Sequence, residues 1–122
     1  MFDHVSLKVS NYAKSRRFYE KALSALGYKL QGEYDGNTAG FGPGETTVLW
    51  IGEGKPASAA VHIAFTASAR AAVREFHAAA VEAGGRDNGK PGVRENYAPT
   101  YYAAFVFDPD GNNIEAVCHS KS

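Results

Sequence analysis

Two histidines and one glutamate are the residues whose types and placement point most clearly to chemistry. His62 stands inside the apolar run AAVHIAFT (59–66), His4 opens the run HVSLKV, and Glu115 is the lone carboxylate of NNIEAVCH (112–119). Burying a carboxylate without a partner is costly, so Glu115 needs a cation nearby. Two imidazoles and one carboxylate that converge on one cavity suit a divalent first-row metal with open coordination positions. Taken singly, each histidine has a simpler explanation as a core residue with one hydrogen-bond partner.

An internal repeat favours the metal site over that simpler explanation. Residues 4–29 align without a gap on residues 62–87, an offset of 58 residues. The aligned pairs include His4 and His62, Ser10 and Ser68, Phe18 and Phe76, and Gly27 and Gly85. Because the two histidines occupy equivalent positions, two unrelated core histidines are a poor explanation, and a shared role is expected.

The repeat predicts the elements that position these residues. In each copy an alternating strand is followed by a helix with apolar residues at helical spacing, and then by short strands. His62 alternates with Val61 and Ile63, so it should lie on the sheet face opposite the helix. Ser10 and Ser68 are expected to cap the two helices. Gly27 and Gly85 are expected to end them in a left-handed conformation.

These patterns predict an α+β fold of two βαβββ modules, residues 1–56 and 57–122, related by a pseudo-two-fold axis in one domain. The last two strands of the second module are joined by DPDG (108–111), a type I turn signature. The second strand of that module is only weakly indicated by the sequence. One module alone leaves a sheet face uncovered. Two modules can pack their helices on one side and form a half-open barrel with the other.

Composition limits the classes of function. The chain has 122 residues, 44% of them hydrophobic and 21% charged, which is typical of a single globular domain. Its 13 basic and 13 acidic residues balance, which argues against nucleic-acid binding and against binding to an anionic membrane. No apolar run is long enough to span a bilayer, and no signal peptide is evident, so we expect a cytoplasmic protein. The single cysteine excludes an internal disulfide.

The segment GKPGVRENYAPTYY (89–102) supplies candidate substrate contacts. It is too long for a hairpin turn, and long loops in compact domains tend to be functional. An arginine can bind a carboxylate or phosphate with two hydrogen bonds, and tyrosines can stack or donate. We therefore predict Arg94, Tyr97 and Tyr101 as substrate-binding residues, with a merely solvated loop as the alternative.

Other polar and aromatic residues have structural explanations. We expect Trp50 and Phe105 to pack in the core rather than line a pocket. His77 should lie on the helix surface and His119 at a frayed end. Cys118 has the opposite parity to Glu115 and should pack toward the helices.

The paired modules, together with DHVSLKV, VHIAF and DPDGNNIEAV, resemble the vicinal oxygen chelate superfamily over nearly the whole chain. That superfamily contains glyoxalase I, bleomycin-resistance proteins, fosfomycin-resistance enzymes and extradiol dioxygenases. The resemblance implies metal ligands on the first and last strand of each module, which are here His4, His62 and Glu115. The fourth position should fall near Leu49, where no Glu, Gln or His is present.

The resemblance implies a metal-dependent enzyme that acts on a small oxygenated substrate, of the lyase, thiol-transferase or dioxygenase type. One divalent ion per site is expected, and Fe, Mn, Zn and Ni are all open. The missing fourth ligand argues against glyoxalase I activity. The resemblance also implies a homodimer whose metal sites take ligands from both chains. The alternative is a non-catalytic protein that sequesters a small molecule, as bleomycin-resistance proteins do. The sequence identifies no catalytic residue.

Overall fold

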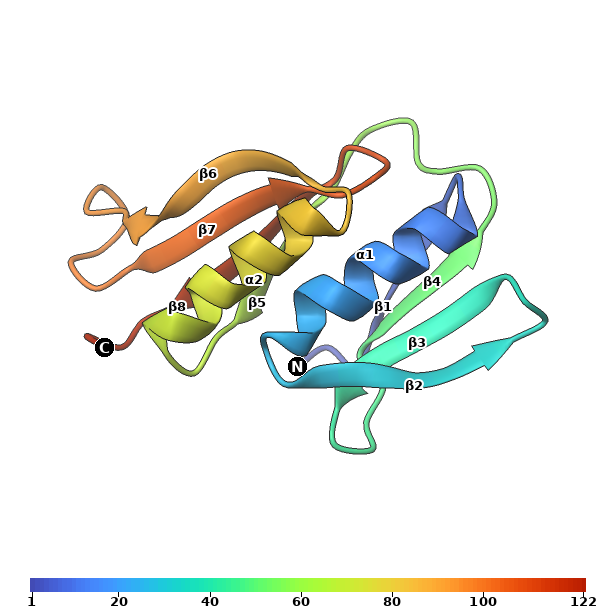
Figure 1. Cartoon of the computed structure of the whole chain (residues 1–122), viewed down its shortest axis with the longest axis horizontal. Helices are drawn as coiled ribbons and strands as arrows, with labels where there is room; N and C mark the ends of the chain where they lie inside the picture. The colour runs from blue at the N-terminus through green and yellow to red at the C-terminus, as the bar shows by residue number, and fades with distance from the viewer.

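A computed structural model describes all 122 residues as two copies of one module that lie side by side (Figure 1). Each module has the order strand, helix, strand, strand, strand, which confirms the predicted α+β fold. The elements of the first module are β1 (Val5–Val9), α1 (Tyr12–Ser24), β2 (Tyr28–Tyr34), β3 (Thr38–Pro43) and β4 (Leu49–Glu53). Those of the second are β5 (His62–Thr66), α2 (Arg70–Glu82), β6 (Arg86–Val93), β7 (Tyr102–Phe107) and β8 (Asn113–Cys118).

Each module folds its strands into its own four-stranded sheet. The strand orders are β1-β4-β3-β2 and β5-β8-β7-β6, in which the first pair is parallel and the other neighbours are antiparallel. The two sheets do not close on each other, as a half-open barrel requires. The weakly indicated strand does form as β6, although its register with β7 shifts on both sides of Gly89. The predicted module boundary after residue 56 lies in the connection between β4 and β5 and stays a prediction.

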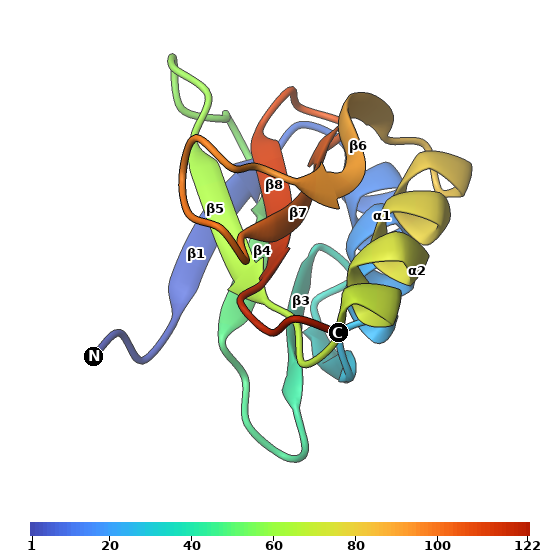
Figure 2. The ribbon, with the colours of Figure 1, turned by 90° about the vertical axis from the view of Figure 1, so that its left-hand side faces the viewer.

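The helices pack side by side on one side of the two sheets, and the other sheet faces are left open (Figure 2). Helix α2 begins 58 residues after α1, as the repeat predicts. One continuous core spans both modules and includes Phe18 of α1 and Phe76 of α2, both fully buried. Cys118 belongs to this core, which confirms that it packs toward the helices. Neither helix has the length and apolar character needed to cross a membrane.

The helix starts differ from the prediction. Asn11 rather than Ser10 is the N-cap of α1, and its side chain accepts a hydrogen bond from the backbone N–H of Lys14 at 3.0 Å. The N-cap of α2 is Ala69 rather than Ser68, and it makes no side-chain cap. In each module the helix begins one residue later than predicted. The Ser10 hydroxyl instead donates to Asp110 at 2.5 Å in the other module.

The glycines that follow the helices match the prediction in the first module and differ from it in the second. Gly27 has φ of +84°, which confirms the left-handed conformation after α1. After α2 it is Gly84, with φ of +105°, and not Gly85 that takes this role. Gly85 is required by close packing, because a Cβ there would lie 2.5 Å from Phe18 and 2.6 Å from Val106.

The DPDG turn ties the two modules together. Asp108 is buried and accepts hydrogen bonds from the backbone N–H groups of Asp110 and Asn112 and from the Asn112 side chain. The Tyr19 hydroxyl of α1 donates to the same carboxylate at 2.5 Å. The Asn112 side chain in turn accepts from the backbone N–H of Val61, before β5. We call this cluster of Tyr19, Asp108 and Asn112 the module latch.

Candidate metal and substrate site

His62 and Glu115 meet on the open face of the second sheet. Strand β5 lies beside β8 with Ala64 opposite Glu115, which places the two side chains within reach. His62 Nε2 lies 2.8 Å from Glu115 Oε1. The glutamate is 1% exposed, whereas about half of the histidine side chain is open to solvent. The contact brings together two of the three predicted ligands, and it gives the buried carboxylate a partner.

Tyr101 holds the other carboxylate oxygen. Its hydroxyl donates to Glu115 Oε2 at 2.5 Å. Burial, together with this hydrogen bond to the carboxylate, raises the pKa of Tyr101 to about 12, so the hydroxyl stays protonated and remains a donor. The rings of Tyr97 and His119 pack edge-on against Tyr101, at 5.0 and 5.3 Å between centroids. The loop after β6 therefore closes over Glu115.

Arg94 lies at the start of that loop in a fixed position. Its two terminal nitrogens donate to the carbonyls of Gly92 and Lys90 at 2.8 and 2.7 Å, and its guanidinium lies 5.3 Å from the Phe105 ring centre. A hollow of about 360 Å³ opens here. Its lining residues are Asn88, Gly89, Arg94, Tyr97, Phe105 and Asn113. The His62 ring lies 6.1 Å from the Phe105 ring, so the hollow adjoins the His62–Glu115 pair.

His4 lies elsewhere, just before β1 in the first sheet. It is exposed, and its Nδ1 lies 2.7 Å from Asp3. No group of three or more His, Cys, Asp or Glu side chains in the chain is placed to hold a metal ion. The imidazole and carboxylate of His62 and Glu115 have the chemistry that a divalent first-row ion prefers. One chain nevertheless brings only two such ligands together.

The strand register defines the position equivalent to Glu115 in the first module. Ala64 pairs with Glu115, and its counterpart 58 residues earlier, Ser6, pairs with Trp50. The equivalent residue is therefore Trp50, whereas its neighbour Leu49 is buried in the core. The indole lies over Gly40, where a Cβ would approach it to 2.9 Å.

The prediction that Trp50 and Phe105 are core residues is wrong. Strand alternation turns both away from the helices and onto the open sheet faces. Trp50 borders a hollow of about 260 Å³ with Ser6, Lys8 and Thr38. Each module thus presents one large aromatic side chain beside a hollow on its open face, Trp50 on β4 and Phe105 on β7.

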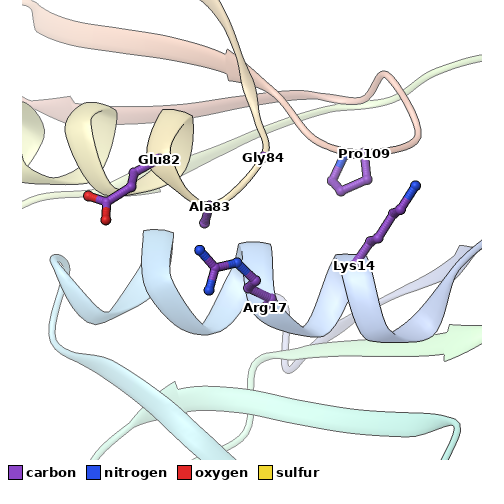
Figure 3. Close-up of a pocket in the computed structure, with 6 residues that line it drawn as sticks. All are labelled: Lys14, Arg17, Glu82, Ala83, Gly84 and Pro109. Atoms are coloured by element: carbon purple, nitrogen blue, oxygen red, sulfur yellow. The ribbon is translucent and has the colours of Figure 1, made fainter.

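A larger hollow, of about 460 Å³, lies on the helix side of the molecule. Figure 3 shows Lys14 and Arg17 of α1 pointing toward the end of α2 and the loop at Pro109. These two cations lie near the C-terminal end of α2, where the helix dipole is negative. The last turn of α2 carries no basic residue of its own. Positive charge is favourable at this end of a helix, and the hollow has no group of metal-ligating side chains.

Comparison with known proteins agrees with this arrangement. The family profile described as glyoxalase/bleomycin resistance protein/dioxygenase superfamily matches residues 1–116. The chain belongs to this superfamily. The match covers both modules and confirms the resemblance seen in the sequence. No curated protein matches the chain.

Several solved structures of the superfamily are similar to the chain. A glyoxalase/bleomycin resistance protein from Albidiferax ferrireducens T118 is 29% identical, with a TM-score of 0.81 over 97% of this chain and 98% of that one. A glyoxalase I mutant from Zea mays is 25% identical, with a TM-score of 0.72 over 97% of this chain and 46% of that one. Lactoylglutathione lyase from Agrobacterium tumefaciens is 16% identical, with a TM-score of 0.67 over 97% and 92%, and shows the shared fold alone.

Proposed function

We propose that the protein is a divalent-metal-dependent enzyme of the glyoxalase superfamily that acts on a small oxygenated substrate. The observation that carries the proposal is the contact between His62 and Glu115 on an open sheet face beside a hollow. In the proposed homodimer these two residues bind the metal together with His4 of a second copy. The cytoplasm is the proposed location.

Each residue of the site has a role in this proposal. A bound divalent ion would supply a Lewis acid toward a carbonyl, epoxide or diol oxygen. Tyr101 orients Glu115 through a hydrogen bond to the oxygen that does not face His62. Residues that orient a ligand in this way commonly govern metal affinity. Arg94 and Tyr97 line the adjoining hollow and contact the substrate.

A protein that sequesters a small molecule without chemistry is the second candidate. Trp50 favours it, because an indole occupies the position where the second module has Glu115. Large aromatic faces bind flat apolar ligands, and Phe105 offers another one in the second module. The same tryptophan argues against a four-ligand site, so glyoxalase I activity is not part of the proposal.

Metal binding separates the two candidates. We expect the purified protein to bind about one divalent ion per site in titrations with Mn, Fe, Ni and Zn, measured by elemental analysis and calorimetry. His62→Ala should abolish the binding. His77→Ala is the matched control, since His77 lies 2.8 Å from Asp87 in a similar pair outside this site. If none of the four metals binds specifically, the enzyme proposal is overturned and sequestration stands.

A further inference from the structure

We propose that the substrate of this site carries an anionic oxygen group, a carboxylate or a phosphate, and that Arg94 binds it. The inference rests on the proposed function in one respect, because it places the substrate on the open face of the second sheet. It goes further by naming the chemical class of the molecule.

Arg94 is held in position before any ligand arrives. Two of its five N–H groups are used by the carbonyls of Lys90 and Gly92, and its planar face lies over Phe105. Three N–H groups remain for a ligand. A guanidinium fixed in this way loses little side-chain freedom on binding, and its planar fork matches the oxygens of a carboxylate or phosphate.

The charge of Arg94 has no partner in the protein. No carboxylate lies within ion-pair distance of its guanidinium, whereas Arg16 has two acidic partners, Glu20 and Glu33. The nearby Glu115 is already engaged on both oxygens by His62 and Tyr101. The other polar side chains that line the hollow belong to Asn88, Asn113 and Tyr97, and all are neutral hydrogen-bonding groups. Among the residues that line the hollow, Arg94 is therefore the one charged group, which favours an anion over a neutral or cationic molecule.

The position of Arg94 relates the anion to the proposed metal ligands. Phe105 lies beneath Arg94, pairs with Glu115 across the strands, and approaches the His62 ring. A molecule whose anionic group binds Arg94 therefore extends along Phe105 toward His62 and Glu115. The hollow, of about 360 Å³, is shallow and open to solvent, so a small ligand can reach Arg94 directly. A small organic acid or phosphate with a second oxygen near its anionic group fits this arrangement.

The test compares two small molecules that differ in charge alone. Glycolate and glycolamide have the same size and the same hydroxyl group, and inorganic phosphate is the third probe. Binding of each probe to the full-length protein is followed by NMR titration, both as purified and after treatment with EDTA. We expect glycolate or phosphate to bind at least about tenfold more tightly than glycolamide, since hydrogen bonds to charged groups are the stronger ones. A preference between glycolate and phosphate identifies the anionic group.

Variants of Arg94 assign the effect. Arg94→Gln should lower the affinity for the preferred anion at least about tenfold, and Arg94→Lys, which keeps the charge but not the fork, should bind it with intermediate affinity. The matched control is Arg86→Gln, because Arg86 also lies over a phenylalanine ring of this sheet, at 5.0 Å from Phe107, but does not line the hollow. The Arg94→Lys variant keeps the test decisive if Arg94→Gln does not fold.

Two results would overturn the inference. One is equal binding of glycolate, phosphate and glycolamide to the unmodified protein. The other is wild-type affinity for the anion in both Arg94 variants. Because the titrations are repeated after EDTA treatment, a failure of metal binding overturns the proposed enzyme without affecting the anion result. Metal binding without anion preference overturns the inference alone.

Discussion

At the scale of single residues, Glu115 depends on Tyr101 as much as on His62. The carboxylate is 1% exposed, and Tyr101 is the partner of its Oε2 atom. We expect Tyr101→Phe to lower the free energy of unfolding by about 1–3 kcal/mol, because a buried charged oxygen loses its donor. Metal affinity at the proposed site should fall about ten- to a hundredfold.

Urea denaturation and metal titration measure these two effects. Tyr97→Phe is the control, since that hydroxyl makes no hydrogen bond in the protein although its ring packs on Tyr101. Equal stability of the Tyr101→Phe and Tyr97→Phe variants would show that Glu115 does not need its second partner.

Asp87 makes a pH-dependent contribution to the free energy of unfolding, and it lies outside the proposed metal and substrate site. The hydrogen bond from His77, with a second from the backbone N–H of Gly89, lowers the pKa of Asp87 from 3.8 to about 2. Because the pKa is lower in the folded state, the stabilisation is complete above about pH 4 and is lost as the pH falls through 2. Asp87→Asn should therefore be less stable than wild type at pH 6, and the two should converge near pH 2.

Denaturation at several pH values checks this expectation. Glu45→Gln, which removes an exposed carboxylate with no hydrogen-bond partner, should show no such convergence. A stability difference between wild type and Asp87→Asn that is constant from pH 6 to pH 2 would contradict the assigned pKa. The same contact shows that His77 is not the ordinary helix-surface residue that the sequence predicted: its side chain is 15% exposed and lies 2.8 Å from Asp87.

At the scale of elements, Gly85 determines how closely the end of α2 approaches the first module. A Cβ at this position would lie 2.5 Å from Phe18 of α1 and 2.6 Å from Val106 of β7. We expect Gly85→Ala to destabilise the protein by about 1–3 kcal/mol through overpacking. Gly84→Ala should also cost about 1–2 kcal/mol, but through its left-handed φ of +105°, since nothing lies within 4 Å of that Cβ.

A double-mutant cycle separates the two causes. Phe18→Leu makes room beside Gly85, so it should cost less in the Gly85→Ala background than in wild type. In the Gly84→Ala background it should cost the same as in wild type. Additive effects in both backgrounds would show that contact with Phe18 is not the reason why Gly85→Ala destabilises the protein.

The sequence predicted those features that repeat and failed where the two copies differ. The offset of 58 residues placed both helices, and strand parity placed His62 and Glu115 on the same face. The caps were wrong because each helix begins one residue later than predicted, and neither hydropathy nor the repeat indicates this shift. The position equivalent to Glu115 could be placed only near Leu49 from the sequence, because only the pairing of Ser6 with Trp50 fixes the register.

The Tyr101–Glu115 contact could not be predicted from the sequence either. Tyr101 belongs to an irregular loop, where no periodicity indicates the direction of a side chain. Its selection as a substrate contact rested on residue type. The length of the loop and the isolated carboxylate in β8 were the available signals, but nothing in the sequence joined them.

At the scale of the whole molecule, the separation of His4 from His62 determines the expected assembly. The two histidines precede or begin β1 and β5, which are edge strands of different sheets, and each sheet leaves its face away from the helices open. A second copy can cover these faces and supply the missing ligand. We therefore expect a homodimer in which His4 of one chain completes the site of the other.

Complementation tests this assembly. Neither His4→Ala nor Glu115→Ala should bind metal alone, because each lacks one ligand in both sites. In a mixed dimer of the two variants, isolated with two different tags, one of the two sites regains all three ligands. We expect about half the metal content of the wild-type dimer. A mixed dimer without metal, or a monomer by light scattering at micromolar concentration, would contradict the shared site.

The module latch has a consequence for the protein during its synthesis. The hydrogen bond of Tyr19 cannot form before Asp108 is synthesised, 89 residues later. That of Ser10 requires Asp110, 100 residues later. At about 5–20 residues per second, the ribosome needs roughly 5–20 s to make the intervening chain. Over that interval the first module emerges with the flank of α1 that later packs on α2 uncovered. Neighbouring ribosomes on one messenger expose the same flank at the same time, so a first module can meet the second module of a neighbouring chain as well as its own.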